Sequence, residues 1–119
     1  MLKIVIGGQI DKQGIERKVK EIAGDKINVV IKTDIEAAMM IKAGQADFYL
    51  GACNTGGGGA LAMAIAILGT NNCVTLSMPG NIKTAEEIRE VMKSGKKAFG
   101  FTAEHIDHVV PVVIGELLK

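Results

Sequence analysis

The sequence predicts a single α/β domain with a five-stranded parallel sheet between two layers of helices, a three-layer doubly wound arrangement. Two observations lead to this fold class. Five short runs rich in β-branched residues alternate with segments of helical period. No linker, low-complexity tract or long charge run divides the 119 residues, a length typical of one domain. With right-handed crossovers, we expect the strand order 2-1-3-4-5.

The first half of the chain contains three predicted strands, at residues 2–6, 27–31 and 47–50. Asp11 is placed to cap the helix after the first strand, and Gly24 to end it. The helix after the second strand begins at Thr33, whose spacing to Glu36 is that of a capping box, and it ends near Gly44. These signals predict two complete βα units before the third strand.

The second half continues the alternation, with strands predicted at residues 73–77 and 98–101. A glycine-rich loop at residues 51–59 follows the third strand and leads into an apolar helix over residues 60–68. A second capping box begins at Thr84 and opens the next helix. The last segment, residues 102–119, is helical in pattern but contains Pro111, which removes a backbone donor. We expect a kink or a break there.

Composition argues against several classes of partner. The 14 basic residues are balanced by 13 acidic ones, so a net charge of +1 offers no field for nucleic acid or an anionic membrane. Three Phe, one Tyr and no Trp leave few platforms on which bases could stack. The longest uncharged apolar stretch, residues 56–68, is too short for a bilayer, which needs about 20 residues. Cys53 and Cys73 lack CxxC spacing, which favours a reducing, cytoplasmic location.

The most informative feature is the loop that begins at Gly51 and ends at Gly59. In doubly wound sheets, ligands bind beyond the carboxyl ends of the strands, where the strand order reverses. Four consecutive glycines at a helix entrance let backbone N–H groups approach an anion, and the helix dipole adds to the attraction. We therefore expect a small phosphate- or carboxylate-bearing metabolite as ligand. The predicted ligand-binding residues are Gly8, Gln9, Asn54, Thr55, Gly56, Gly57, Gly58, Ser77 and Asn81.

The same glycines have a purely structural interpretation, because a residue without a Cβ permits a tight turn and close packing of a helix on a sheet. The run does not match a nucleotide fingerprint. It lacks the Gly-Lys-Ser/Thr ending of a P-loop and meets the GxGxxG spacing only trivially. No cofactor is therefore predicted.

Cys53 is the one candidate catalytic residue in this region. Neighbouring amides and a helix N-terminus lower the pKa of a thiol, but no histidine is near Cys53 in the sequence, which favours a small buried apolar residue at the strand end. His105 and His108 lie three residues apart beside acidic side chains, a spacing compatible with a metal. Exposed polar residues in a first helical turn give the same pattern, so no metal site is predicted.

The helix over residues 60–68 carries no charge on any side, so something must cover it. The neighbouring helix is also apolar on two sides, with Ala37, Met40 and Ile41 among its residues. Either the domain buries both helices centrally or a second subunit packs on them. We expect a homo-oligomer, with a dimer as the expected form.

Two stretches, KIVIGGQ at residues 3–9 and GACNTGGGGALAMAIAILG at residues 51–69, resemble the YhfU-like family of small bacterial proteins of unknown function. The resemblance covers nearly the whole chain. It implies a bacterial cytoplasmic protein and brings no known activity with it.

A more distant similarity is to the B-type ribose 5-phosphate isomerases, in which a cysteine ends a strand before a glycine-rich loop and a helix of small residues. That resemblance implies that Cys53 moves a proton between sugar carbons, with Gly56 to Gly58 as oxyanion donors. The family also has an Asp-His pair after its first strand, where this chain has Gly8 and Gln9. The two alternatives to simple ligand binding are therefore an isomerase using Cys53 and an oligomeric assembly or regulatory subunit without catalysis.

Overall fold

The computed structural model describes residues 1–54 and 57–119 of the chain. The strands are β1 (Leu2–Gly8), β2 (Ile27–Ile31), β3 (Phe48–Cys53), β4 (Cys73–Thr75), β5 (Ser77–Met78), β6 (Asn81–Ile82) and β7 (Ala98–Thr102). The helices are α1 (Lys12–Ala23), α2 (Asp34–Lys42), α3 (Gly57–Leu68), α4 (Ala85–Lys93) and α5 (Ile106–Leu117). Three short 3-10 turns, η1 (Gly24–Lys26), η2 (Thr70–Asn72) and η3 (Ala103–His105), connect some of them.

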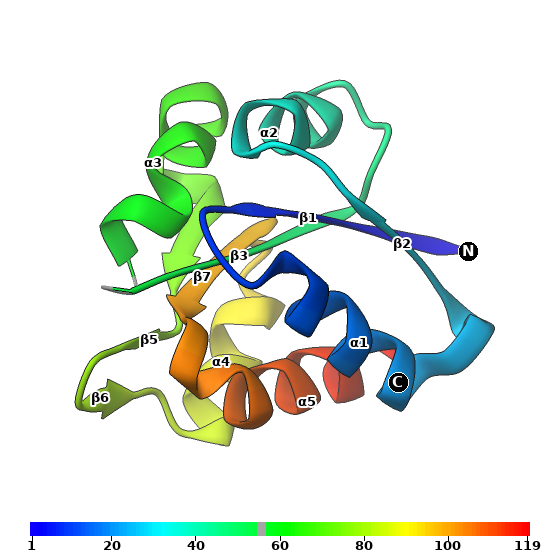
Figure 1. Ribbon diagram of the computed structural model, residues 1–119, viewed down its shortest axis with the longest axis vertical. Coiled ribbons are helices and arrows are strands. Elements are labelled where there is room, and N and C mark those ends of the chain that lie inside the picture. The colour runs from blue at the N-terminus through cyan, green and yellow to red at the C-terminus, as the bar shows by residue number, and fades with distance from the viewer. Residues whose placement is uncertain (55–56) are drawn as a thin grey trace.

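Five of the strands form a parallel sheet in the order β2-β1-β3-β7-β4, and β5 and β6 form a separate antiparallel hairpin. Helices α2 and α3 cover one face of the sheet, and α1, α4 and α5 cover the other (Figure 1). The three-layer doubly wound α/β class predicted from the sequence is confirmed. Among the described residues, none of the helices is long and apolar enough to cross a membrane.

The order of the last two strands differs from the expected 2-1-3-4-5. The fifth predicted strand, β7, lies between β3 and β4, and β4 forms the edge. All five residues of β7 are buried, which suits a strand with neighbours on both sides, whereas β4 has only three residues. The chain therefore crosses over β7 through α3 on one face and returns through α4 on the other, so that right-handed crossovers are kept.

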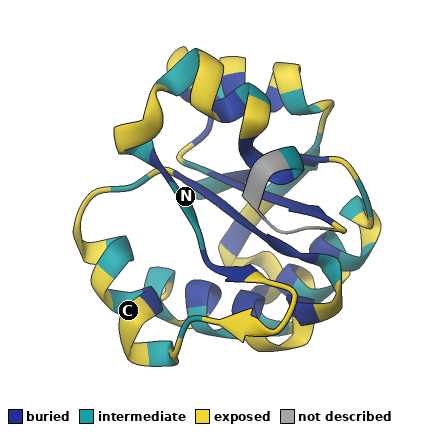
Figure 2. Ribbon diagram, turned by 90° about the vertical axis from the view of Figure 1, so that its left-hand side faces the viewer, coloured by how far each residue is buried: buried dark blue, intermediate teal, exposed yellow. Residues whose placement is uncertain are grey.

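Two apolar layers hold the helices to the sheet, and alternate residues of each strand point into opposite layers. In β3, Leu50 packs with Ile15 and Val109 in the layer beneath α1 and α5. Tyr49 packs with Ala37 and Leu61 in the layer beneath α2 and α3. Figure 2 shows the strands buried between helices whose outer sides are exposed. Because both faces of the sheet are covered, ligands can reach it only at its edges and strand ends.

The predicted glycine-rich loop is shorter than residues 51–59. Strand β3 continues to Cys53, and α3 already begins at Gly57. The strand is longer than predicted because it is paired on both sides, with Ala52 opposite Gly8 of β1 and Cys53 opposite Thr102 of β7. Of the predicted site residues, Thr55 and Gly56 lie outside the described residues.

Local signals at the helix ends behave as predicted. Asp11 caps α1, its side chain accepting from the Gly14 backbone N–H at 3.2 Å, and it adopts a left-handed conformation with φ 50°. Both capping boxes are formed, at Thr33 for α2 and at Thr84 for α4.

The C-terminal segment differs from the prediction in two respects. Thr102 ends β7 and is not part of the helix, because it is paired with Cys53 of β3. A kink or a break was expected at Pro111, and a break is not observed, since α5 runs through it. The turns on both sides of Pro111 bury Val109 and Val113 against the sheet, which holds the helix together despite the missing backbone donor.

Candidate ligand-binding site at the carboxyl edge of the sheet

The end of β1 turns sharply against β3. Gly8 has φ +79°, and the next two backbone N–H groups, of Gln9 and Ile10, both donate to the Ala52 carbonyl at 2.9 and 3.3 Å. A Cβ at Gly8 would lie 2.7 Å from the Ala52 nitrogen and 2.9 Å from the Gly51 Cα. Only glycine fits this position, because both the backbone conformation and the close approach exclude a side chain.

A buried phenol ties this turn to α3. The Gly8 backbone N–H donates to the Tyr49 hydroxyl at 2.9 Å, and that hydroxyl donates to the Ala60 carbonyl at 2.9 Å. Burial raises the pKa of Tyr49 well above its ordinary value, so the hydroxyl stays protonated and can donate. Tyr49 therefore sets the position of the first turn of α3 relative to the end of β1.

The entrance of α3 faces the side chain of Gln9. A Cβ at Gly59 would lie 2.5 Å from the Gln9 Oε1 atom, so glycine leaves the room that this amide occupies. The helix opens with Gly57, Gly58 and Gly59 and, like α1, has no acidic residue in its first turn, whereas α2 and α4 each have two. The positive end of the α3 dipole is therefore not offset by a carboxylate of that turn.

Cys53 and Thr102 lie side by side at the ends of β3 and β7. Both are buried, at 1% and 3% exposure, and strand alternation places their side chains on the sheet face that α3 covers. The Thr102 hydroxyl has no hydrogen-bond partner within the described part of the chain. Sequence reasoning missed Thr102, and the signal available was a polar residue at the end of a wholly apolar strand.

The Ser77 hydroxyl is engaged within the protein. It accepts from the Thr102 backbone N–H at 3.0 Å and lies 2.9 Å from Nδ1 of His105, whose Nε2 lies 3.5 Å from Glu104. These contacts hold β5 against the end of β7. His105 is buried while His108 is exposed, so the two histidines are not brought together as a pair of ligands. Among residues 1–54 and 57–119, no group of three or more metal-ligating side chains is present.

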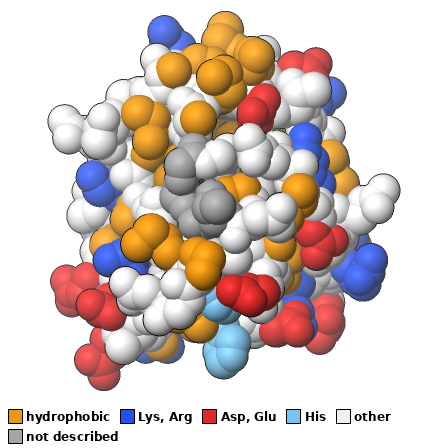
Figure 3. Space-filling model, turned by 60° about the vertical axis from the view of Figure 1, so that its left-hand side comes forward, with side chains coloured by type: hydrophobic (Ala, Val, Ile, Leu, Met, Phe, Trp, Pro, Cys, Tyr) orange, Lys and Arg blue, Asp and Glu red, His pale blue; other side chains and the backbone are white. Residues whose placement is uncertain are grey.

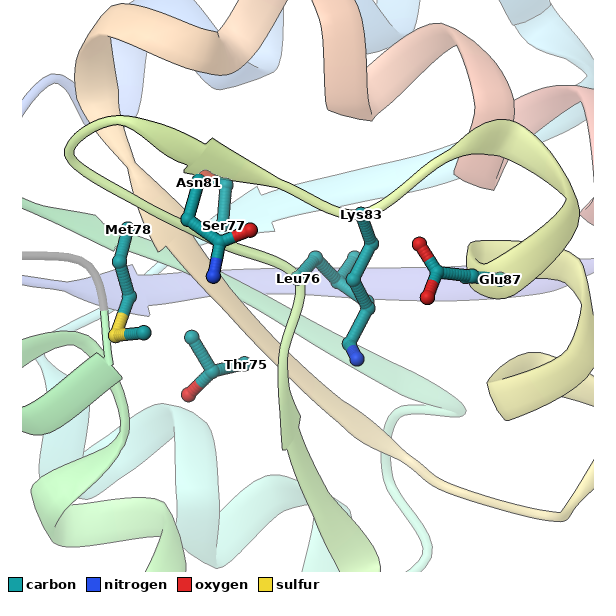
Figure 4. Close-up of a pocket in the computed structure, with 7 residues that line it drawn as sticks. All are labelled: Thr75, Leu76, Ser77, Met78, Asn81, Lys83 and Glu87. Atoms are coloured by element: carbon teal, nitrogen blue, oxygen red, sulfur yellow. The ribbon is translucent and has the colours of Figure 1, made fainter.

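Asn81 lies on the β5–β6 hairpin, and with Ser77 it lines a cavity of about 210 Å³ whose wall includes Thr75 and Lys83 (Figure 4). Sequence reasoning did not identify Thr75 or Lys83, because the hairpin that brings them together depends on pairing between β5 and β6. The turn of this hairpin is Pro79-Gly80, with Gly80 at φ +75°, a sequence suited to a type II turn.

The predicted site residues thus fall into two neighbouring groups. Gly8 and Gln9 lie at the end of β1, where Gln9 contacts the first turn of α3; Gly57 and Gly58 open that helix, and the exposed Asn54 directly follows β3. The other group, Ser77 and Asn81, lies on the hairpin beside β7. Figure 3 views the molecule from this side, with apolar side chains gathered above, over α2 and α3, and histidine below.

Fold and site together define a doubly wound α/β protein with a glycine-opened helix at the carboxyl edge of its sheet. Residues 2–117 match the family DUF2620, described as proteins of unknown function, and the chain belongs to that family. It is 41% identical over 117 residues to the uncharacterized protein YhfU of Escherichia coli strain K12, covering 98% of this chain and 99% of that protein. The uncharacterized YhfU proteins of Escherichia coli O6:H1 and Shigella flexneri match to the same extent. No solved structure matches the chain.

Proposed function

We propose that this protein binds a small metabolite carrying a phosphate or carboxylate group at the entrance of α3, and that it does so in the bacterial cytoplasm. The observation that carries the proposal is the meeting of the β1 turn with the first turn of α3. There Gln9 lies against Gly59, and no acidic side chain of the turn offsets the helix dipole.

Two further features support binding at this place. The Tyr49 hydrogen bonds to Gly8 and Ala60 hold both backbone segments in fixed positions, which lowers the ordering cost of binding. The unpartnered hydroxyl of Thr102, in the described part of the chain, is a buried polar group that a ligand oxygen or a water would satisfy.

A Gly59→Ala substitution tests the proposal. The new Cβ would occupy the position of the Gln9 amide, which can swing away because it ends a flexible side chain. Stability should be unchanged or rise by up to about 1 kcal/mol, because alanine favours the helix. Stabilisation by anions in a thermal-shift screen of phosphorylated sugars, nucleotides and organic acids should be lost.

Gly115→Ala in α5 is the matched control. A Cβ there meets nothing within 4 Å, so it gives the same gain in helix propensity without touching the site. It should respond to anions as the wild type does. A wild-type protein that no anion stabilises, or equal responses of Gly59→Ala and wild type, would count decisively against a site at this helix entrance.

A specific observation favours the second candidate function, an oligomeric assembly or regulatory subunit. Three large apolar side chains on α2 and α3 are exposed, with exposed fractions of 53% for Ile35, 51% for Met39 and 38% for Ile65. The domain therefore does not cover these two helices by itself. A second copy of the chain would remove this surface from water.

Light scattering tests that candidate. We expect a dimer at micromolar concentration, and a monomer when Met39 and Ile65 are both replaced by Glu, because two charges would be buried at the interface. Ile82→Glu changes an apolar side chain of similar exposure, 37%, on the hairpin and should leave the dimer intact. A wild-type monomer would dismiss the candidate.

The Cys53 isomerase hypothesis stays a prediction. The relatives named above are not described as isomerases, and the thiol is only 1% exposed at the end of β3. Turnover of pentose or hexose phosphates that is lost in Cys53→Ser would be needed to support it.

A further inference from the structure

Three polar side chains, those of Thr75, Asn81 and Lys83, line the cavity beside the hairpin. The side chains of Thr75, Asn81 and Lys83 make no hydrogen bond or ion pair within the described part of the chain. In Figure 4 the Asn81 amide and the Lys83 side chain lie on either side of Leu76, and Thr75 lies below Asn81 with its hydroxyl directed away from Lys83. Amide, ammonium and hydroxyl are all hydrogen-bond donors, and such a set suits a carboxylate or a phosphate.

The backbone places these groups firmly. The Lys83 backbone N–H donates to the Leu76 carbonyl at 3.0 Å, which holds the strand leaving the hairpin against the strand entering it. Asn81 pairs with Met78 across the hairpin. The base of Lys83 is thereby fixed, and its side chain is half-buried along the cavity wall.

The ammonium group of Lys83 is not paired with the nearby carboxylate of Glu87 in the described part of the chain. Glu87 also lines the cavity, on the side of Lys83 away from Asn81 in Figure 4, and its carboxylate accepts the Thr84 backbone N–H at 2.9 Å. That hydrogen bond, more than any charge, lowers the pKa of Glu87, so the carboxylate is committed to capping α4. No ion pair joins Glu87 to Lys83 in the described part of the chain.

This cavity lies close to the entrance of α3. Ser77, which lines the cavity, is bonded to Thr102 of β7, and Thr102 is paired with Cys53 at the end of β3. Two strand spacings of about 4.8 Å place the cavity roughly 10 Å from the end of β3. Its volume of about 210 Å³ is below the roughly 300 Å³ of a typical small-molecule site, so it would hold one end of a ligand.

We propose that Lys83, Asn81 and Thr75 form a subsite for a second acidic group of the ligand bound at α3. The ligand class is then a small metabolite with two acidic groups, one at each end, such as a phosphate and a carboxylate. This inference rests on the proposed function. It adds a requirement that a single anion site does not impose, namely that affinity depends on the group at the far end of the ligand.

Two probes that differ only in that group test the subsite. 6-Phosphogluconate ends in a carboxylate, and sorbitol 6-phosphate has a hydroxymethyl group in its place. Titrations followed by NMR chemical shifts should show that the wild type binds 6-phosphogluconate about tenfold more tightly, as one charge-assisted hydrogen bond would give. Lys83→Met should bind both probes with the affinity that the wild type has for sorbitol 6-phosphate.

Lys93→Met is the matched control, because Lys93 is an exposed lysine of α4 that does not line the cavity. It should keep the tenfold preference. Equal wild-type affinities for the two probes, or a preference that survives in Lys83→Met, would overturn the subsite and leave binding at α3 intact. If Lys83→Met bound neither probe while Gly59→Ala bound both as the wild type does, the site at α3 would be overturned instead. Failure of the wild type to bind either probe would overturn both proposals.

Discussion

Gly8→Ala is expected to destabilise the domain by about 3 kcal/mol or more, the largest effect of any alanine substitution considered for this site. Two costs add. Alanine is strained at φ +79°, and its Cβ would lie 2.7 Å from the Ala52 nitrogen. The obstacle is backbone of β3, which is paired on both sides and cannot move aside cheaply. Urea denaturation followed by circular dichroism gives the free energy of unfolding.

Gly44→Ala separates the two costs. Gly44 has nearly the same φ, +75°, but a Cβ there meets nothing within 4 Å. Gly44→Ala should therefore lower the free energy of unfolding only by the cost of the backbone conformation, about 1 kcal/mol. If both variants lost the same free energy, the close approach of β1 to β3 would not be energetically important, contrary to our interpretation of the turn.

Tyr49→Phe is expected to cost about 2 kcal/mol and to abolish anion binding. The change keeps the buried ring but removes the hydroxyl that accepts from Gly8 and donates to Ala60. The buried Gly8 N–H then has no partner, and the turn after β1 is no longer tied to α3. Denaturation and the thermal-shift screen measure the two effects. Ser94→Ala, which removes a hydrogen bond at an exposed helix end, should cost less than about 1 kcal/mol and leave binding unchanged.

Tyr49→Phe should also change how the free energy of unfolding depends on pH. Because the folded pKa of Tyr49 is raised, the protonated phenol stabilises the fold fully below the unfolded pKa of about 10, and this contribution is lost as pH rises above it. Stability should therefore fall above about pH 10 in the wild type and fall less in Tyr49→Phe. The chain has one tyrosine and no tryptophan, so tyrosinate absorbance reports this group alone. Ionisation of the phenol at its ordinary pKa, before unfolding, would contradict its burial.

The elements could be predicted from sequence because their signals are local. The capping boxes at Thr33 and Thr84 and the cap at Asp11 each depend on residues within one helical turn, and all three are formed. The boundary of β3 was missed because it depends on pairing with β1 and β7. A glycine such as Gly51 indicates a turn when only its neighbours in the chain are considered.

The candidate site divides in the same way. The glycine-rich segment before the apolar helix was evident from composition, as were Gly8 and Gln9 after the first strand, although the helix was expected to begin at residue 60 and begins at Gly57. Tyr49 was not identified, since its hydroxyl reaches Gly8, 41 residues away, and Ala60, 11 residues away. Lys83 was not identified either, because a surface lysine has no local signal that distinguishes it from its neighbours.

By itself, the sequence determined the α/β class, the succession of the five sheet strands and the helices between them, and a glycine-rich entrance to an apolar helix, but not the β5–β6 hairpin. Propensity, capping and periodicity act over a few residues, so these features can be predicted from the chain. Only the tertiary structure decided that β7 lies between β3 and the edge strand β4. It also decided that Thr102 lies beside Cys53 and that Lys83 and Asn81 line the same cavity. These arrangements depend on which buried surfaces pack together across long sequence separations, and no local pattern records that choice.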